Sequence, residues 1–447
     1  MLALAAPFAA ACARLTSSRS LKHMDPRSDS KSSWLSALLA PVSVDEFLSS
    51  YWLKQHLFCG GSAERFSGLL SWTALNEILE HHWRESYRFR LACQGRDLEP
   101  ASYADLDGDT PRIRARDVTD HLRRGATLSF DAIDELHEPL TRLAESFEAF
   151  FRGGTKINIY AGWRALHGLD LHRDNQEIFI LQLDGRKRWL LYGFSVDGVD
   201  RSGLGSTSVP PAGAVLDQIL QPGDLLYIPR GCYHVAVPMN EPALHLTLGV
   251  KNPRTMDLLE WMVERLRKDG VADRDLPHLA GPAERLRYSA ELRSALFESL
   301  APDLVELYFS ETGSNSKPRP SFSLPWSATP ERLPPGRDFS VRLNGQAHLI
   351  PNGDSDAGAV ELRCRGHRYR FPRSMRWIIE QLDNNAPLPI GRLVEAVAGR
   401  VDEGMVRMLV GMLLTQGLVT IREHRRPGAA TSEPGPISPD VDGKGIF

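Results

Sequence analysis

The sequence has few cysteines and no cysteine pair, which excludes two kinds of stabilised fold. Its five cysteines are Cys12, Cys59, Cys93, Cys232 and Cys364. An odd number of scattered cysteines without a CxxC pair argues against both a disulfide framework and a thiolate zinc site. We therefore expect a reducing, cytoplasmic setting.

Long apolar runs and a strong charge imbalance are also missing. A membrane-spanning helix needs about 18 consecutive apolar residues, and no stretch of the sequence is that long, so we expect no membrane contact. The formal net charge of −3 provides no overall field toward nucleic acid. What remains is a chain of 447 residues, 42% hydrophobic and 24% charged, which is typical of a globular protein with about two or three domains.

The first part of the chain, residues 1–33, is predicted to be a disordered extension. Its apolar start, MLALAAPFAAACARL, is short and lacks the basic n-region of a secretory signal. The Ser-rich segment that follows has the composition of a disordered chain. We expect Met24 to be the native start, and a signal peptide is the alternative.

Residues 34–252 are predicted to form one domain in which helices precede a run of short strands. A capping box of Ser43 and Glu46 begins the first amphipathic helix. From about residue 155 the hydrophobic period changes to two, and turn signals such as Asp184-Gly185 separate the strands. This pattern is typical of an antiparallel barrel or jelly roll, so the fold class is α+β.

The remaining residues divide by composition into four segments. Residues 253–311 return to helical periodicity, and apolar helices of this kind often mediate dimerisation. Residues 312–336 are rich in Ser and Pro and are predicted to be a linker. Residues 337–424 end in three helices and a closing strand, the order of a winged helix, and residues 425–447 are predicted to be a disordered tail.

The candidate chemistry lies in the segment DLHRDNQEIFILQLDGRKRW, residues 170–189. Because strand side chains alternate, His172 and Asp174 are expected on one face with Arg173 turned outward, and Asp170 joins them if the strand begins early. His234 follows later, after the turn in PGDLLYIPRGCYHV. Two imidazoles and one carboxylate form the facial triad that holds non-haem Fe(II) and leaves positions open.

Two further strands place polar side chains on one face. Asn158 and Tyr160 alternate in KINIYA, and His245 and Thr247 alternate in ALHLTLGV. Polar groups inside a barrel are costly unless a bound polar molecule satisfies them, and Lys187 can supply a cation to it. Each residue alone also has an ordinary interpretation, His245 as a core histidine and Lys187 as a solvated strand charge. The combination favours the iron site.

Together these segments resemble the JmjC-type cupins of the ribosomal oxygenase group, which are Fe(II)- and 2-oxoglutarate-dependent protein hydroxylases that consume O2. The resemblance is strong over about residues 155–252 and otherwise rests on the order of elements: N-terminal helices, a helical dimerisation segment and a winged-helix domain. It implies a double-stranded β-helix whose catalytic iron ligands are His172, Asp174 and His234.

The resemblance also implies a cosubstrate pocket. Lys187 would pair with the distal carboxylate of 2-oxoglutarate, and Asn158, Tyr160 and Thr247 would line the pocket. Gly162 departs from the family, which usually has Thr or Ser there, and a bulky loop follows it.

The implied function is hydroxylation of an amino-acid side chain in a protein or peptide by a homodimeric enzyme, with a ribosomal protein as one candidate substrate. Two alternatives stay open. One is a non-catalytic metal-binding cupin that acts through its winged helix as a regulatory or ribosome-binding factor. The other is a peptide-natural-product oxygenase, for which the altered loop at 161–168 is the only feature.

The segment from Arg363 to Arg376 is rich in arginine and has two interpretations. It is a nucleic-acid or ribosome-contacting patch, with Tyr369 and Trp377 available for stacking. Alternatively, it is a solvated hairpin whose arginines pair with nearby acids such as Glu380. A salt-dependent affinity for RNA or DNA distinguishes the two.

Overall fold

The computed structural model describes residues 33–82, 87–106, 111–194, 213–268, 270, 273–300, 302–312, 322–329, 333–344, 347–350, 359–364, 367–382 and 387–424. The chain divides into two compact units, Met1–Arg319 with Arg363–Tyr369, and Pro320–Leu362 with Arg370–Phe447. Residues 1–32 of the predicted extension, including Met24, and the predicted tail at 425–447 lie outside the described residues.

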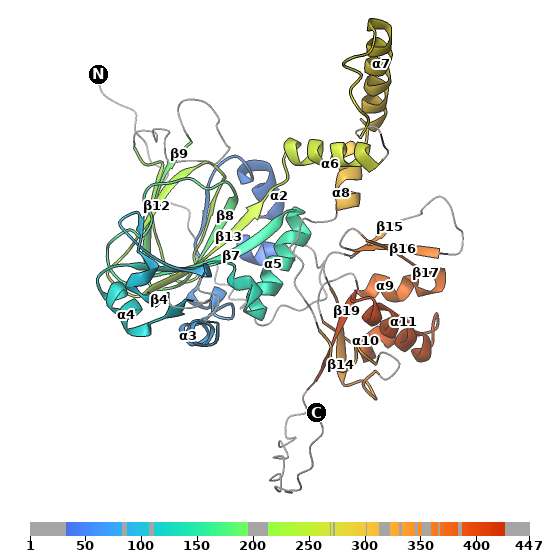
Figure 1. The fold of residues 1–447 in the computed structure, drawn as a ribbon. Coiled ribbons are helices and arrows are strands. Elements are labelled where there is room, and N and C mark those ends of the chain that lie inside the picture. Colours follow the sequence, from blue (N-terminus) through green and yellow to red (C-terminus); the bar gives the residue numbers. More distant parts are fainter. Residues whose placement is uncertain are drawn as a thin grey trace, which may run out of the picture. The chain divides into compact units, whose positions relative to one another are not determined.

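The first unit is built on a large antiparallel sheet and a small one (Figure 1). In spatial order, the large sheet contains β1 (Leu57–Cys59), β11 (Leu225–Ile228), β8 (Glu177–Asp184), β13 (Ala243–Lys251), β7 (Gly154–Gly162), β6 (Thr127–Phe130), β2 (Phe89–Cys93) and β3 (Arg96–Asp97). The small sheet contains β10 (Leu216–Leu220), β9 (Lys187–Gly193) and β12 (Tyr233–Pro238). A separate short hairpin joins β4 (Ala104–Asp105) to β5 (Arg112–Ile113).

The central part of β8, residues 178–181, is apolar without interruption because it is buried on both faces. Phe179 and Leu181 belong to the larger core, which also contains buried residues of the helices. Ile178 and Ile180 belong to a second core with Trp189 of the small sheet. A central strand with a hydrophobic layer on each side has no polar face to alternate with. The predicted antiparallel barrel is therefore confirmed as two sheets that enclose an inner core.

Helices pack against the other face of the large sheet and contribute residues to the larger core. They are α1 (Ser33–Leu39), α2 (Val44–Glu46) with a π-helical turn (Phe47–Tyr51), α3 (Trp72–His81), α4 (Ala115–Arg123) and α5 (Glu138–Phe151), with 3₁₀ turns at Ala63–Phe66, Pro100–Ser102 and Ile133–Glu135. The predicted cap is present, since the Glu46 amide donates to the Ser43 hydroxyl at 3.1 Å. Rings of Phe47, Phe147 and Phe179 pack at 5.1 to 5.8 Å between centroids.

Three helices follow the barrel, namely α6 (Thr255–Lys268), α7 (Pro282–Ser299) and α8 (Leu304–Thr312). Helix α7 contains no buried residue. Its apolar side chains Leu286 and Phe297 are 72% and 69% exposed. Exposed apolar side chains on a helix surface are a feature of oligomer interfaces.

The second unit contains a three-stranded sheet and three helices. The sheet is β18 (Leu388–Pro389), β14 (Phe339–Leu343) and β19 (Val419–Glu423), and the helices are α9 (Arg376–Leu382), α10 (Ile390–Ala396) and α11 (Glu403–Thr415), with a 3₁₀ turn at Arg373–Met375. The chain also contains a sheet of β15 (Ala347–Ile350), β16 (Ala359–Cys364) and β17 (His367–Pro372), which is not confined to the second unit. Asp402 caps α11 through the Met405 amide at 2.8 Å, and Gly417 follows the helix at φ 67°.

The arginine-rich segment is described only in part, and the side chains at 363–367 lie outside that part. Arg376 forms an ion pair with Glu380 at 2.7 Å. The guanidinium of Arg400 covers the ring of Trp377 at 3.8 Å from its centroid. The ion pair of Arg376 agrees with the interpretation of this segment as a solvated hairpin. Arg400 occupies one face of the Trp377 ring. Across the described helices, none is long and apolar enough to cross a membrane.

Candidate metal centre

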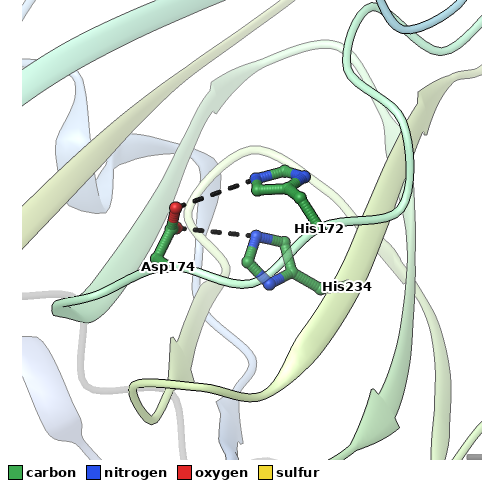
Figure 2. Close-up of side chains that lie close together, drawn as sticks. All are labelled: His172, Asp174 and His234. Carbon is green, nitrogen blue, oxygen red and sulfur yellow. Dashed lines mark ion pairs between the residues drawn. The ribbon is translucent and has the colours of Figure 1, made fainter. Parts of the chain in front are cut away.

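Three side chains converge at one end of the barrel, His172, Asp174 and His234 (Figure 2). Their potential ligand atoms all lie within 4.8 Å of one another. Nε2 of His172 is 3.8 Å from Oδ1 of Asp174, and Nε2 of His234 is 3.6 Å from Oδ2. Two imidazole nitrogens and a carboxylate in this arrangement can hold one divalent metal ion on a single side.

The backbone fixes the two histidines relative to each other. The His172 amide donates to the His234 carbonyl at 3.1 Å, and the His234 amide donates to the His172 carbonyl at 2.8 Å. This isolated antiparallel bridge lies before β8, so His172 is outside the regular strand. The carbonyl of Asp174 accepts the Gly231 amide at 3.0 Å, which ties the third residue to the turn before β12.

Hydrogen bonds also fix the tautomer of each imidazole. Nδ1 of His172 donates to the Asp170 carbonyl at 2.8 Å, and Nδ1 of His234 donates to the Cys232 carbonyl at 3.0 Å. Because a carbonyl only accepts, Nδ1 carries the proton and Nε2 keeps its lone pair toward Asp174. Burial, together with the nearby His172, lowers the pKa of His234 to about 4, so this ring is neutral at pH 7.

A pocket continues from these three residues into the barrel. Its lining also includes Tyr160, Lys187 and Thr247. Lys187 is 5% exposed, and no carboxylate of the described residues lies within ion-pair distance of it. Its Nζ lies 6.0 Å from the ring centroid of Tyr160 and 5.9 Å from that of Trp189. Burial without a counter-charge lowers the pKa of Lys187 to about 7.

Three more polar atoms of the lining have no hydrogen-bond partner. They are Oγ1 of Thr127, Nε1 of Trp189 and Nδ1 of His245. Burial and the charge of Lys187 lower the pKa of His245 well below its usual value, so its ring is neutral. Unpaired buried polar atoms are rare in folded proteins, and here they share one cavity with an unpaired cation. The pocket therefore fits a small anion with several acceptor atoms.

Three other residues lie differently from what the sequence predicts. Arg173 is not turned outward: it is buried, and its guanidinium lies 5.6 Å from the ring centroid of Tyr233. The strict alternation of a strand does not apply there because only His172 is in a bridge. Asp170 does not join the metal-binding group, since its exposed carboxylate pairs with His167 at 2.9 Å. Asn158 is not among the pocket-lining residues, and its Oδ1 accepts the Ala132 amide at 3.0 Å.

The lining includes residues that sequence reasoning did not assign to the site. Trp189 lies two positions after Lys187 on β9, and this spacing is the signal that could have identified it. Thr127 belongs to β6, which pairs with β7, and its alternation with Leu128 and Ser129 in TLSF is the signal that could have identified it. His245 was recognised as sharing a face with Thr247, and both line the pocket.

The departure at Gly162 has a steric reason. A Cβ at this position would lie 2.7 Å from Cγ of Pro238, at the end of β12. The loop that follows is held by neighbouring segments, with the Ala165 amide donating to Oδ1 of Asn240 at 2.8 Å. The glycine thus allows close packing of β7 on β12 near the pocket.

Fold and site together define a class: a double-stranded β-helix with a two-histidine, one-carboxylate group is the architecture of non-haem Fe(II) cupins. The family described as the JmjC domain matches residues 133–258, which span all three candidate ligands. The resemblance to JmjC-type cupins of the ribosomal oxygenase group is confirmed by this match and by the relatives below.

Among curated proteins, the chain is 29% identical to Ribosomal oxygenase 2 of Rattus norvegicus over 266 residues, 55% of this chain and 54% of that protein. It is 31% identical to the Bifunctional lysine-specific demethylase and histidyl-hydroxylase NO66 of Drosophila grimshawi over 250 residues, 53% of this chain and 33% of that protein. The chain thus spans about half or less of the length of these relatives.

Among solved structures, the fold is similar to that of YcfD, a ribosomal oxygenase from Escherichia coli in complex with cobalt and 2-oxoglutarate. The TM-score is 0.55 at 20% sequence identity, and the match covers 86% of this chain and 99% of that chain. The similarity extends beyond the JmjC domain and establishes the fold.

Proposed function

We propose that this protein is an Fe(II)- and 2-oxoglutarate-dependent oxygenase that hydroxylates an amino-acid side chain in a protein or peptide. One observation carries the proposal: the potential ligand group and an unpaired buried cation line the same pocket. A metal-binding scaffold without cosubstrate has no use for a desolvated lysine, because burying that charge costs stability. The names of the relatives, which are oxygenases and hydroxylases, support the same activity.

In this proposal His172, Asp174 and His234 hold Fe(II), and the Nδ1 hydrogen bonds to backbone carbonyls keep both Nε2 atoms available as ligands. Bound iron would supply the activation of O2, coupling oxidation of 2-oxoglutarate to succinate and CO2 with insertion of one oxygen atom into a substrate C–H bond. The barrel positions the reactants and limits the access of water.

Lys187 would pair with the distal carboxylate of 2-oxoglutarate. A charge-assisted bond in a buried site compensates the desolvation of the lysine. Tyr160 and Thr247, with the unpaired ring nitrogens of Trp189 and His245, surround the same space. Asn158 would act behind this layer, by holding the backbone at Ala132.

The substrate is proposed to be a ribosomal protein. The relatives named ribosomal oxygenases and the ribosomal oxygenase from Escherichia coli support this choice. Cytoplasmic localisation agrees with it, since Cys59, Cys93 and Cys232 are free thiols.

We also propose a homodimer, with the second unit as a winged helix. The exposed apolar side chains of α7 support a subunit interface, and the three helices with a small sheet support the winged helix. We propose the domain bounds that the sequence predicts: 34–252 for the oxygenase, 253–311 for the dimerisation segment, 312–336 for the linker and 337–424 for the winged helix. A measured salt-dependent affinity for RNA or DNA would assign nucleic-acid contact to the arginine-rich segment from Arg363 to Arg376.

The test measures succinate by NMR with the full chain, Fe(II), 2-oxoglutarate and O2, with and without a fraction of ribosomal proteins. We expect succinate formation that rises with the fraction, and a mass increase of one oxygen atom in one of its proteins. Lys187→Met should lose turnover, and Arg188→Met, an exposed neighbour on the same strand, should keep it. Absence of both turnover and 2-oxoglutarate binding in the iron-loaded protein would refute the oxygenase and leave the non-catalytic cupin.

A further inference from the structure

A second polar pocket adjoins the loop that carries Asp174. Its lining consists of Asn175, Gln176, Arg230, Lys251, Asn252 and Arg254. These residues come from three separate parts of the chain: the positions directly after Asp174, the turn between β11 and β12, and the end of β13 with its connection to α6. Three cations and three amides therefore meet in one small cavity, with no acidic side chain in its lining.

The positive charge of this pocket is poorly compensated. Lys251 and Arg254 share a single carboxylate, Asp257, at the long distance of 3.8 Å from each. Arg230 forms no ion pair with any described residue, and its Nε is buried without a hydrogen-bond partner. Its backbone amide donates to Glu177 at 3.3 Å, but its guanidinium does not. A buried guanidinium N–H without an acceptor is costly, and an anionic ligand would supply the acceptor.

The backbone holds the pocket in place. The Gly231 amide donates to the Asp174 carbonyl at 3.0 Å, which joins the turn containing Arg230 to the segment containing Asn175. Strand β13 pairs with β8 through Val250 and Glu177, so Lys251 follows directly beside Gln176. Gly249 makes room for the Gln176 amide, because a Cβ at 249 would overlap it. The donors are thus carried by paired strands and a fixed turn, which favours a built site.

We propose that this pocket binds a phosphate group. A carboxylate is planar and is satisfied by one guanidinium in a bidentate pair, whereas a phosphate has oxygens in several directions and accepts from several donors. Cations from three segments around one cavity match the second geometry. The phosphate is either free inorganic phosphate or part of an RNA backbone, and both offer the same oxygens. The site is distinct from the cosubstrate pocket, because the two linings share no residue.

The test is calorimetric titration of the full chain with inorganic phosphate in a buffer without other oxyanions, at constant ionic strength. We expect saturable binding that weakens about tenfold or more in Arg230→Gln, since a hydrogen bond between charged groups is lost. Lys251→Gln is a second variant, because it lies at an exposed strand end and preserves the turn. Arg188→Gln changes the net charge equally at a distant ion pair and should bind phosphate as the native protein does.

A parallel titration with a short single-stranded RNA distinguishes the two sources. RNA that binds more tightly than inorganic phosphate, and loses this advantage in Arg230→Gln and Lys251→Gln, identifies a backbone phosphate; equal affinity per phosphate identifies the free ion. Neither titration requires iron or turnover, so the outcome is independent of the oxygenase assay. The proposal is overturned if the native protein shows no saturable phosphate binding, or if Arg188→Gln weakens binding as much as the two pocket variants do.

Discussion

Replacing Lys187 by methionine should make the protein more stable while it removes cosubstrate binding. Methionine keeps a flexible apolar chain of similar length but carries no charge. Burial lowers the pKa of Lys187 from 10.5 to about 7. At about 1.36 kcal/mol per pH unit, this fall corresponds to about 5 kcal/mol of destabilisation in the empty protein. We expect most of it to be recovered in Lys187→Met, as a rise of roughly 5–10 °C in Tm at pH 7.

The stability difference between Lys187→Met and the native protein should depend on pH. Below pH 7 the lysine is protonated in both the folded and the unfolded protein, and the full cost of burying its charge is present. Between pH 7 and 10.5 the folded protein holds a neutral amine while the unfolded chain still binds the proton, so the stability of the native protein rises with pH. The advantage of Lys187→Met over the native protein should therefore shrink steadily across this range.

Thermal unfolding of the metal-free native protein, Lys187→Met and Arg188→Met at several pH values between 6 and 10 is the assay. Arg188→Met removes an exposed cation and should change the free energy of unfolding by about 1 kcal/mol or less. With iron present, calorimetry should show 2-oxoglutarate binding weakened about 10- to 100-fold in Lys187→Met. The claim that Lys187 is buried without a counter-charge would be refuted by either of two results. Lys187→Met could be no more stable than the native protein at pH 7, or its gain in stability could be independent of pH.

Three further outcomes are expected. Asp174→Ala should lower succinate formation by at least about a thousandfold and abolish saturable Co(II) binding at the site, so retention of both would exclude this carboxylate as a ligand. Gly223→Ala should lower the free energy of unfolding by about 2–4 kcal/mol in a denaturation experiment, because a Cβ at φ 92° would overlap the neighbouring backbone. The control Gly213→Ala, at φ 89° with open space around it, should lower it by only about 1 kcal/mol. Phe297→Glu should shift the mass measured by light scattering from dimer to monomer, whereas Ser294→Glu on the same helix should not.

Much of the site could be predicted because its residues follow local rules. His172 and Asp174 precede an apolar strand, His234 follows a turn marked by Pro and Gly, and Lys187 comes directly after the Asp184-Gly185 turn. The turn is present at φ 59° for Gly185. The three potential ligand atoms are close together as the resemblance implied. The cosubstrate roles of Asn158, Tyr160 and Thr247 remain predictions.

Other features depend on pairings between distant parts of the chain. Strands β2 and β6 are short and extend the large sheet next to β7, and apolar and polar residues alternate over only a few positions there, in YRFRL and TLSF. Thr127 enters the pocket through this pairing. Arg173 turns inward because the segment around it is a loop anchored by one bridge, and the side-chain alternation of a strand does not apply there. Tertiary contacts decide these positions.

The bridge between His172 and His234 also bears on when the site comes into existence during folding. Each residue donates to the other's carbonyl, and the two are far apart along the chain, one before β8 and one in β12. The donor set is therefore completed by a long-range pairing of the barrel, and the local segment that contains His172 and Asp174 supplies only part of it. A nascent or partly unfolded chain would offer a metal ion His172 and Asp174 from one local segment, but without His234 beside them. Redox-active iron would thus be retained by finished barrels, in which the reaction is enclosed, and metal affinity can serve as a direct readout of complete folding.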